Sequence, residues 1–217
     1  MKKVLLIISL LILVTGCSLV NIDNQSYQQI LDSVLVDGKK LKNVSLEGYS
    51  YYLPKGVILK NTNNKYNSIL YYNHSKMYLY VDVVSYYHKI DSNYETTDGY
   101  VSIDINRSGK KGYLEITKLD DYCFVEFMYN YAKIEANVLE KDLKKTVTQM
   151  AYILNNVNYN DSVLATVIGE NVFSYDEEVF NIFKSKRDTD TFLKFEELYQ
   201  YDAKKDEDTI DLGEDTK

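Results

Sequence analysis

The stretch that decides the fold is VLEKDLKKTVTQMAYILN, residues 138–155. Its apolar side chains recur at intervals of three and four residues, which gathers them on one side of an α-helix. They are Leu139, Leu143, Val147, Met150 and Leu154. Asn137 followed by Glu140 resembles a capping box at the start of this helix. Because a single apolar stripe needs one apolar surface to cover, we expect the helix to pack on one face of a β-sheet.

The chain before this helix has the alternating pattern of that sheet. From Gly48 to about Ala136 apolar side chains recur at every second position, with short turn sequences between the runs. Connections this short join antiparallel neighbours. The expected strands are 49–53, 57–59, 66–72, 77–84, 100–105, 112–118 and 122–129. The Pro54–Gly56 turn makes the first two of them a predicted hairpin.

Further elements are expected on both sides of this region. A first helix is predicted over 26–35, with Tyr27, Ile30, Leu31 and Val34 on its apolar side. After the long helix, the β-branched run at 162–168 predicts a last strand. Two C-terminal helices follow, one over 174–183 and one around Phe192. Residues 202–217 are acidic with little to bury, which predicts a disordered tail.

The segment GYSYYLPKGV, residues 48–57, carries an aromatic strand into a Leu-Pro-x-Gly turn. It resembles the opening hairpin of the Mog/PsbP-like superfamily, and the long helix ending in Ile153–Asn156 fits the same family. The resemblance covers about residues 26–161. It implies an antiparallel sheet covered by helices and a non-catalytic role as an adaptor or accessory subunit. Val57 departs from the family, in which an aromatic residue often follows the turn glycine, and the family transfers no catalytic residue.

The chain opens with the features of an exported protein. Lys2 and Lys3 precede an apolar run over 4–14, and Thr15, Gly16 and Cys17 follow. These are a basic n-region, an apolar h-region and a small-residue cleavage site. As a helix, the apolar run would cover only about 17 Å of a hydrocarbon core about 30 Å thick. We therefore expect the segment to be removed.

Val14 to Cys17 resembles the lipobox of bacterial lipoproteins. The resemblance implies diacylglyceryl transfer to the Cys17 sulfur and cleavage between Gly16 and Cys17. Two acyl chains give stable anchoring, whereas one binds a membrane only marginally. The expected location is the extracytoplasmic face of the cell membrane. The alternative is an ordinary secretory signal that happens to contain a cysteine.

These patterns define the predicted organisation. The fold class is α+β: an antiparallel β-sheet flanked by helices, a PsbP-like sandwich, with extra C-terminal helices and a disordered acidic tail. Residues 1–16 are the signal peptide, 17–25 a lipidated tether, 26–201 a single domain and 202–217 the tail. The domain has enough chain for a sizeable core.

Composition limits the partners. Without residues 1–16 the chain has 23 basic and 32 acidic side chains, a net charge of −9, which disfavours nucleic acid and anionic head groups as partners. Cys123 is the one cysteine besides Cys17, so an internal disulfide is not available once Cys17 is lipidated. The 22 tyrosines are compatible with glycan or peptide binding, but codon usage is the preferred explanation of their number. An AT-rich genome would produce the same excess, and the near absence of arginine agrees with that.

Few residues offer catalytic or metal chemistry. Cys123 with His74 or His88 is a candidate nucleophile and base, but Cys123 alternates with apolar residues on the expected core face, which predicts an inert thiol. Asp91, Asn93 and Glu95 have the spacing of a calcium loop. That loop fails at its sixth and twelfth positions, which hold Thr96 and Ser102. Phosphate-loop, serine-hydrolase and zinc-protease motifs are absent from the sequence.

The sequence therefore predicts a membrane-anchored, non-enzymatic binding or accessory protein whose partner is another extracytoplasmic protein. It predicts no cofactor, no metal and no nucleic-acid partner. The alternative is a carrier that holds a lipid, glycan or peptide in an aromatic pocket. The first candidates for lining such a pocket are Tyr51, Tyr72, Tyr78 and Tyr80. An unrecognised hydrolase is a third hypothesis.

Overall fold

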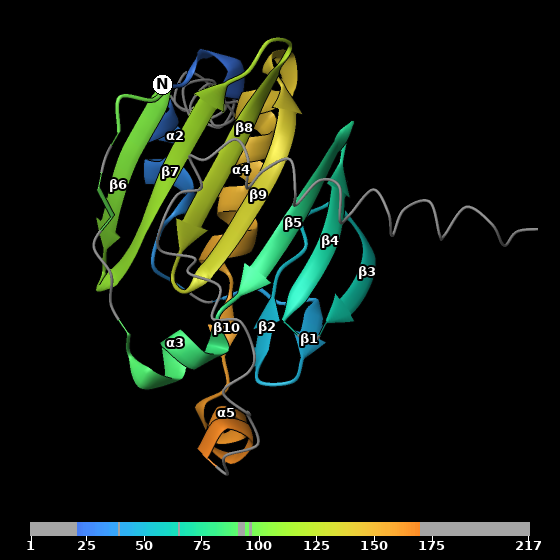
Figure 1. Cartoon of the computed structure of the whole chain (residues 1–217), viewed down its shortest axis with the longest axis vertical. Coiled ribbons are helices and arrows are strands. Elements are labelled where there is room, and N and C mark those ends of the chain that lie inside the picture. Colours follow the sequence, from blue (N-terminus) through green and yellow to red (C-terminus); the bar gives the residue numbers. More distant parts are fainter. Residues whose placement is uncertain (1–20, 39, 65, 91–93, 96, 170–217) are drawn as a thin grey trace, which may run out of the picture. The chain divides into compact units, whose positions relative to one another are not determined.

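The computed structural model describes residues 21–38, 40–64, 66–90, 94–95 and 97–169 (Figure 1). The chain divides into two units, 1–183 and 184–217, and all described residues belong to the first. The helices are η1 (Ile22–Asn24), α2 (Tyr27–Val34), α3 (Val83–His88), η2 (Glu140–Asp142), α4 (Leu143–Asn155) and α5 (Asp161–Gly169). The strands are β1 (Val44–Leu46), β2 (Tyr49–Tyr51), β3 (Ile58–Asn64), β4 (Asn67–Tyr72), β5 (Ser75–Val81), β6 (Val101–Arg107), β7 (Lys110–Lys118), β8 (Tyr122–Tyr129), β9 (Ala132–Leu139) and β10 (Asn158–Tyr159).

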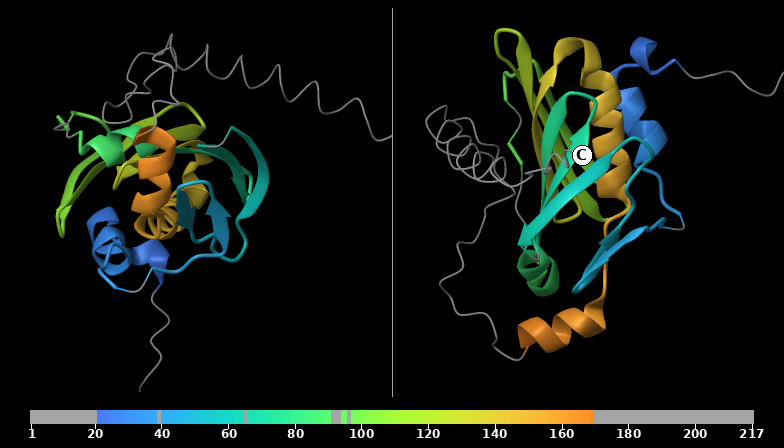
Figure 2. Two further views of the ribbon diagram at one scale, coloured as in Figure 1. Left: turned by 90° about the horizontal axis from the view of Figure 1, so that it is seen from below. Right: turned by 90° about the vertical axis from the view of Figure 1, so that its right-hand side faces the viewer.

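Two antiparallel sheets and the helices packed on them confirm the α+β class. The larger sheet has the order β3-β4-β5-β9-β8-β7-β6, and the smaller one the order β1-β2-β10. Seen from below, the larger sheet curves around α4 (Figure 2). Sequence neighbours pair throughout it except for β5 with β9, which closes the two hairpin regions into one sheet.

The core lies between the concave face of this sheet and helices α2 and α4. On β8, the residues Cys123, Val125 and Phe127 are buried side by side, as their alternation predicts. The predicted stripe of α4 is also buried, at Leu143, Val147, Met150 and Leu154. Helix α2 begins with a true capping box, in which Ser26 and Gln29 exchange hydrogen bonds. The two helices and the covered sheet face were thus predicted correctly.

The predicted start of the long helix is wrong. Val138 and Leu139 continue β9, and α4 begins at Leu143 without the Asn137–Glu140 box. The reason is that β9 lies between β5 and β8. Residues 132–136 pair with both neighbours, and residues 137–139 go on pairing with β8, from Phe124 to Tyr122, so the strand runs on past the start of the local helical pattern.

The predicted hairpin of 49–53 with 57–59 is also wrong. Its turn exists, since the N–H of Val57 donates to the Pro54 carbonyl at 3.1 Å. However, β2 pairs with β1 and β10, whereas β3 pairs with β4 in the other sheet. A turn sequence determines where the chain reverses its direction. Which strands then pair depends on the distant strands that lie beside them in the sheet.

Two further strand predictions are corrected: one predicted strand is a helix, and another is shorter than expected. Residues 162–168 lie in helix α5, because the Asn160 carbonyl and side chain accept hydrogen bonds from Leu164 and Val163 and so begin a helix. The predicted strand 77–84 stops at Val81, where Asp82 caps α3 through a 2.8 Å bond from the Ser85 N–H. The predicted signal peptide, the two C-terminal helices and the acidic tail lie outside the described residues.

Candidate functional site

The long strands give the domain two ends. Strand β8 starts, β9 finishes and α4 begins at one end, where the Lys144 ammonium donates to the Asp23 carbonyl of η1 at 2.7 Å. We call this the η1 end. At the opposite end, the β8–β9 turn lies beside α3, β10 and α5; we call this the α3 end. Figure 1 shows the η1 end above and the α3 end below.

Three tyrosines from distant segments meet at the α3 end. Tyr86 of α3 stacks on Tyr159 of β10, with ring centroids 3.8 Å apart and planes 12° apart. Tyr131 of the β8–β9 turn meets Tyr86 edge-on at 5.6 Å. The Lys89 ammonium lies 3.6 Å from the centre of the Tyr86 ring. We refer to these four residues as the tyrosine cluster.

Hydrogen bonds hold the rings in place. The Tyr86 hydroxyl donates to the Asp161 carboxylate at 2.9 Å, and the Tyr159 hydroxyl donates to the Asn130 carbonyl at 2.9 Å. Lys89 caps the C-terminus of helix α3 in a left-handed conformation, and its ammonium lies over the Tyr86 ring. Stacking and hydrogen bonding together leave these side chains little rotational freedom.

The β8–β9 turn carries backbone strain at the cluster. Asn130 and Tyr131 are both left-handed, with φ of 52° and 61°. This is the conformation of a two-residue type I′ turn, in which glycine is the usual second residue. A bulky residue there costs of the order of 1 kcal/mol or more. The fold therefore keeps a tyrosine at a position where the backbone favours glycine.

The electrostatics keep the phenols neutral. Burial first, and then the hydrogen bond and charge of Asp161, raise the pKa of Tyr86 to about 12. Burial, followed by the charge of Asp82 and the neighbouring phenols, also raises the pKa of Tyr159 well above its ordinary value. Neutral hydroxyls and partly exposed rings form an amphipathic surface with a cation at its edge. Such a surface suits contact with protein or peptide.

A second polar group lies on the convex face of the large sheet. The Lys133 ammonium contacts Glu126 at 2.7 Å and Glu135 at 2.8 Å, and all three side chains are buried. On the next strand Glu115 accepts hydrogen bonds from Tyr94 at 2.6 Å and Thr97 at 3.0 Å. Desolvation lowers the pKa of Lys133, but attraction to Glu135, Tyr113 and Glu126 outweighs it and raises the pKa above its ordinary value. The group keeps its lysine charged.

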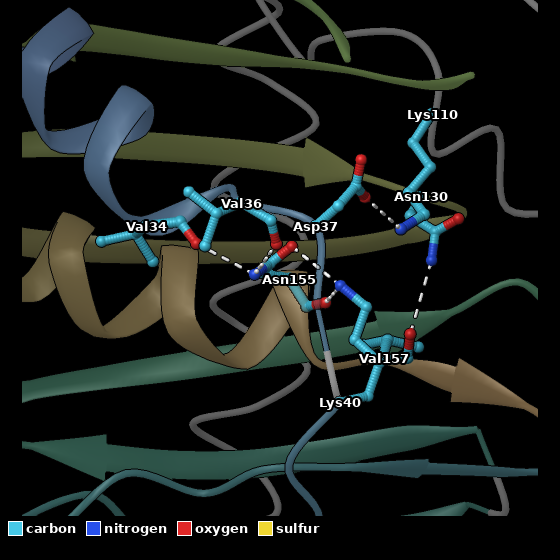
Figure 3. A network of polar contacts seen from close by, with 8 residues as sticks. All are labelled: Val34, Val36, Asp37, Lys40, Lys110, Asn130, Asn155 and Val157. Carbon is cyan, nitrogen blue, oxygen red and sulfur yellow. Dashed lines mark hydrogen bonds and ion pairs between the residues drawn. The ribbon is translucent and has the colours of Figure 1, made fainter. Parts of the chain in front are cut away.

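A third network joins the chain after α2 to the end of α4 (Figure 3). The Asn155 amide donates to the carbonyls of Val34 and Val36 at 2.9 and 3.2 Å. Lys40 donates to the Asn155 carbonyl at 2.6 Å. Burial, reinforced by Lys110, lowers the pKa of Lys40 to about 8. Because these bonds end on backbone groups, the network has a structural role.

The four tyrosines proposed to line a pocket do not share one surface. Tyr51 is fully buried in the core and its hydroxyl donates to Ser68 at 3.4 Å. Tyr72 packs against the same core. Tyr78 and Tyr80 point to the opposite face of β5, where they stand across from Glu135 and Lys133. Sequence reasoning did not find the tyrosine cluster, because only the fold brings its segments together.

The predicted burial of Cys123 is confirmed. Cys123 is 1% exposed, and burial raises its pKa. His74 is exposed and lies 3.8 Å from Asp142, and His88 packs edge-on against Tyr87. Among the described residues no group of three or more histidine, cysteine or acidic side chains could hold a metal ion. Asp91 and Asn93 of the rejected calcium loop lie outside the described residues.

Comparison with known families bears on the N-terminus. The model of the prokaryotic membrane lipoprotein lipid attachment site matches residues 1–18, which include Gly16 and Cys17. The match supports a membrane-anchored bacterial lipoprotein. A search of curated proteins found no match. Across the part of the chain that the structure describes, no helix combines the length and the hydropathy that a bilayer span requires.

Proposed function

We propose that this lipoprotein is a non-enzymatic binding or accessory protein on the extracytoplasmic face, and that its α3 end contacts another extracytoplasmic protein. The observation that carries the proposal is the tyrosine cluster. Its rings are fixed before any partner arrives, so binding would cost little side-chain entropy. Tyrosine is also among the residues that contribute most to the centre of protein interfaces.

The attachment of the chain supports the same assignment. The matched lipid attachment site ends a few residues before η1 in the sequence, and the tyrosine cluster lies at the end of the strands opposite η1. In this proposal Cys17 carries the lipid and the cluster faces away from the membrane. The resemblance of residues 48–57 to the Mog/PsbP-like superfamily belongs to the proposal too, since members of that family act as adaptors or accessory subunits.

Position-specific crosslinking in intact cells tests this function. A photoreactive phenylalanine analogue is placed at position 87, beside the cluster, or at position 58, an exposed site on the edge strand β3. We expect a discrete protein adduct from position 87 that is absent from position 58. Tyr86→Ala should abolish the adduct, whereas the matched change Tyr152→Ala, at a 41% exposed position of α4, should leave it. Equal adducts from both positions, or none from position 87, would contradict the proposal.

The carrier hypothesis gains no support from the four tyrosines first considered, because they are divided between two faces of the sheet. A hydrolase also lacks a supporting observation. Cys123 is buried, and the carboxylates Glu126 and Glu135 are both engaged by Lys133.

A further inference from the structure

Three large apolar side chains are exposed together at the η1 end. Tyr100 directly precedes β6, and Leu119 and Tyr122 flank the β7–β8 turn, which closes through a 2.8 Å bond from the Leu119 N–H to the Tyr122 carbonyl. Their exposed fractions are 54%, 37% and 50%. Exposed apolar groups that gather at one place on a domain mark a contact surface. We call these three residues the apolar tip.

The apolar tip lies at the end where the chain enters the domain. The Lys118 ammonium lies 5.7 Å from the centre of the Tyr100 ring and 3.1 Å from Glu140 of η2. Tyr27, the first residue of α2, is close to the same groups: its pKa is raised first by burial and then by Tyr100, Cys123 and Glu140. The first described elements of the domain, η1 and α2, therefore lie beside the apolar tip.

The tether to the lipid is short. Cys17 and Asn21, the first described residue, are four residues apart. Even a fully extended chain of that length reaches only about 14 Å. A lipid on Cys17 would therefore hold the η1 end within that distance of the membrane surface.

We propose that the apolar tip, Tyr100, Leu119 and Tyr122, rests in the interfacial layer of the membrane to which the chain is anchored. The inference rests on the lipid anchor of the proposed function. Tyrosine favours this layer because its ring is apolar and its hydroxyl remains hydrated. The contact sets the orientation of the domain: β8 has eight residues, so the tyrosine cluster stands about 26 Å farther from the membrane.

The charges around the tip indicate that the contact is apolar. The lysines at this end are Lys118, Lys141, Lys144 and Lys145. The acids are Asp23, Asp98, Asp120, Asp121, Glu140 and Asp142, so the described acids slightly outnumber the lysines. With the two signs nearly balanced, attraction to anionic head groups is weak. The tip should therefore depend on the lipid anchor to reach the membrane, and added salt should not release it.

Fluorescence from a single indole tests the contact, since the chain has no tryptophan. Tyr122→Trp places the reporter in the tip, and Ile90→Trp is the matched control, because Ile90 is 46% exposed and follows α3. The lipidated full-length variants are reconstituted in phosphatidylcholine and phosphatidylglycerol vesicles with bromine-labelled acyl chains. We expect quenching and a shift to shorter wavelength for the indole at position 122. The indole at position 90 should show neither.

Vesicle flotation of the same samples separates the two possible failures. If both variants float and the indole at position 122 is no more quenched than the control, the membrane contact is refuted while the anchor stands. If neither variant floats, the anchor fails and the inference fails with it. Loss of quenching at about 1 M salt, where the Debye length is about 3 Å, would refute the apolar nature of the contact.

Discussion

Both ends of the domain present tyrosines to solvent, but the rings are held in different ways. At the α3 end Tyr86 and Tyr159 stack at 3.8 Å, and both hydroxyls donate to fixed acceptors. At the η1 end Tyr100 and Tyr122 are about half exposed, at 54% and 50%. The same residue type is thus rigid at one end and largely solvated at the other.

The difference follows from what each end is proposed to contact. A folded partner has a fixed surface, so rings that are already ordered lose little entropy on binding. A lipid interface is fluid and needs no fixed complementarity, so rings that keep their rotational freedom suit it. The burial and hydrogen bonding of each tyrosine therefore distinguish a proposed protein contact from a proposed membrane contact. The number of tyrosines in the chain does not.

The largest loss of stability should come from a substitution in the large sheet that joins the two ends. Lys133→Met removes the ammonium that contacts both buried carboxylates, Glu126 at 2.7 Å and Glu135 at 2.8 Å. We expect a loss of about 3–5 kcal/mol in the free energy of unfolding, measured by urea titration. Lys55→Met, at an exposed turn position, is the control and should stay within about 0.5 kcal/mol. Similar values for the two variants would show that the buried ion pairs contribute little.

The same substitution at each end sharpens the comparison. Tyr159→Ala removes the stacked ring and the bond to the Asn130 carbonyl, and should cost about 2–3 kcal/mol because the ring is half-buried. Tyr122→Ala should change the stability by no more than about 0.5 kcal/mol, because its ring is half exposed. Equal losses in thermal or urea unfolding would remove the distinction between a rigid and a solvated end.

A smaller effect should appear at high pH. Tyr86→Phe removes the hydrogen bond to Asp161 and should cost about 0.5–1 kcal/mol near neutral pH. Since the pKa of Tyr86 is raised from 10.0 to about 12, the folded state favours the neutral phenol. Its contribution is complete below pH 10 and is lost as the pH rises towards 12. The stability difference between wild type and variant should therefore shrink over that range, and a difference that grows would contradict the assignment.

The smallest change in stability is expected at the strained turn. Tyr131→Gly relieves a left-handed backbone but loses the edge-on contact with Tyr86, and each effect is about 1 kcal/mol. Unfolding should therefore be nearly unchanged. The crosslink from position 87 should nevertheless be lost, since the ring belongs to the tyrosine cluster. A variant that keeps the crosslink would show that Tyr131 is retained for another reason.

Local patterns predicted what depends on local interactions. The apolar stripe of α4 and the buried alternation of Cys123 and Val125 were visible because burial repeats with the period of the element. Pairing was not predictable: the turn at Pro54–Gly56 forms, yet the strands on its two sides join different sheets. The β-branched run at 162–168 became α5 because Asn160 supplies the first helical hydrogen bonds.

The candidate site was the least predictable part. Tyr86, Tyr131 and Tyr159 come from a helix, a turn and a short strand that are far apart in the sequence. Nothing near any one of them distinguishes it from the other tyrosines of the chain. The unusual position of Tyr131, where a type I′ turn favours glycine, becomes visible only once the turn is known.

The most direct test of the account is the location of a Cys17→Ser variant in fractionated cells. The account predicts that wild type is in the membrane fraction and that the variant, which cannot accept the acyl chains, is not retained there. Without the anchor, the nearly balanced charges of the η1 end should not hold the domain on lipid. A Cys17→Ser protein that is fully processed and still bound to membranes would contradict the central claim.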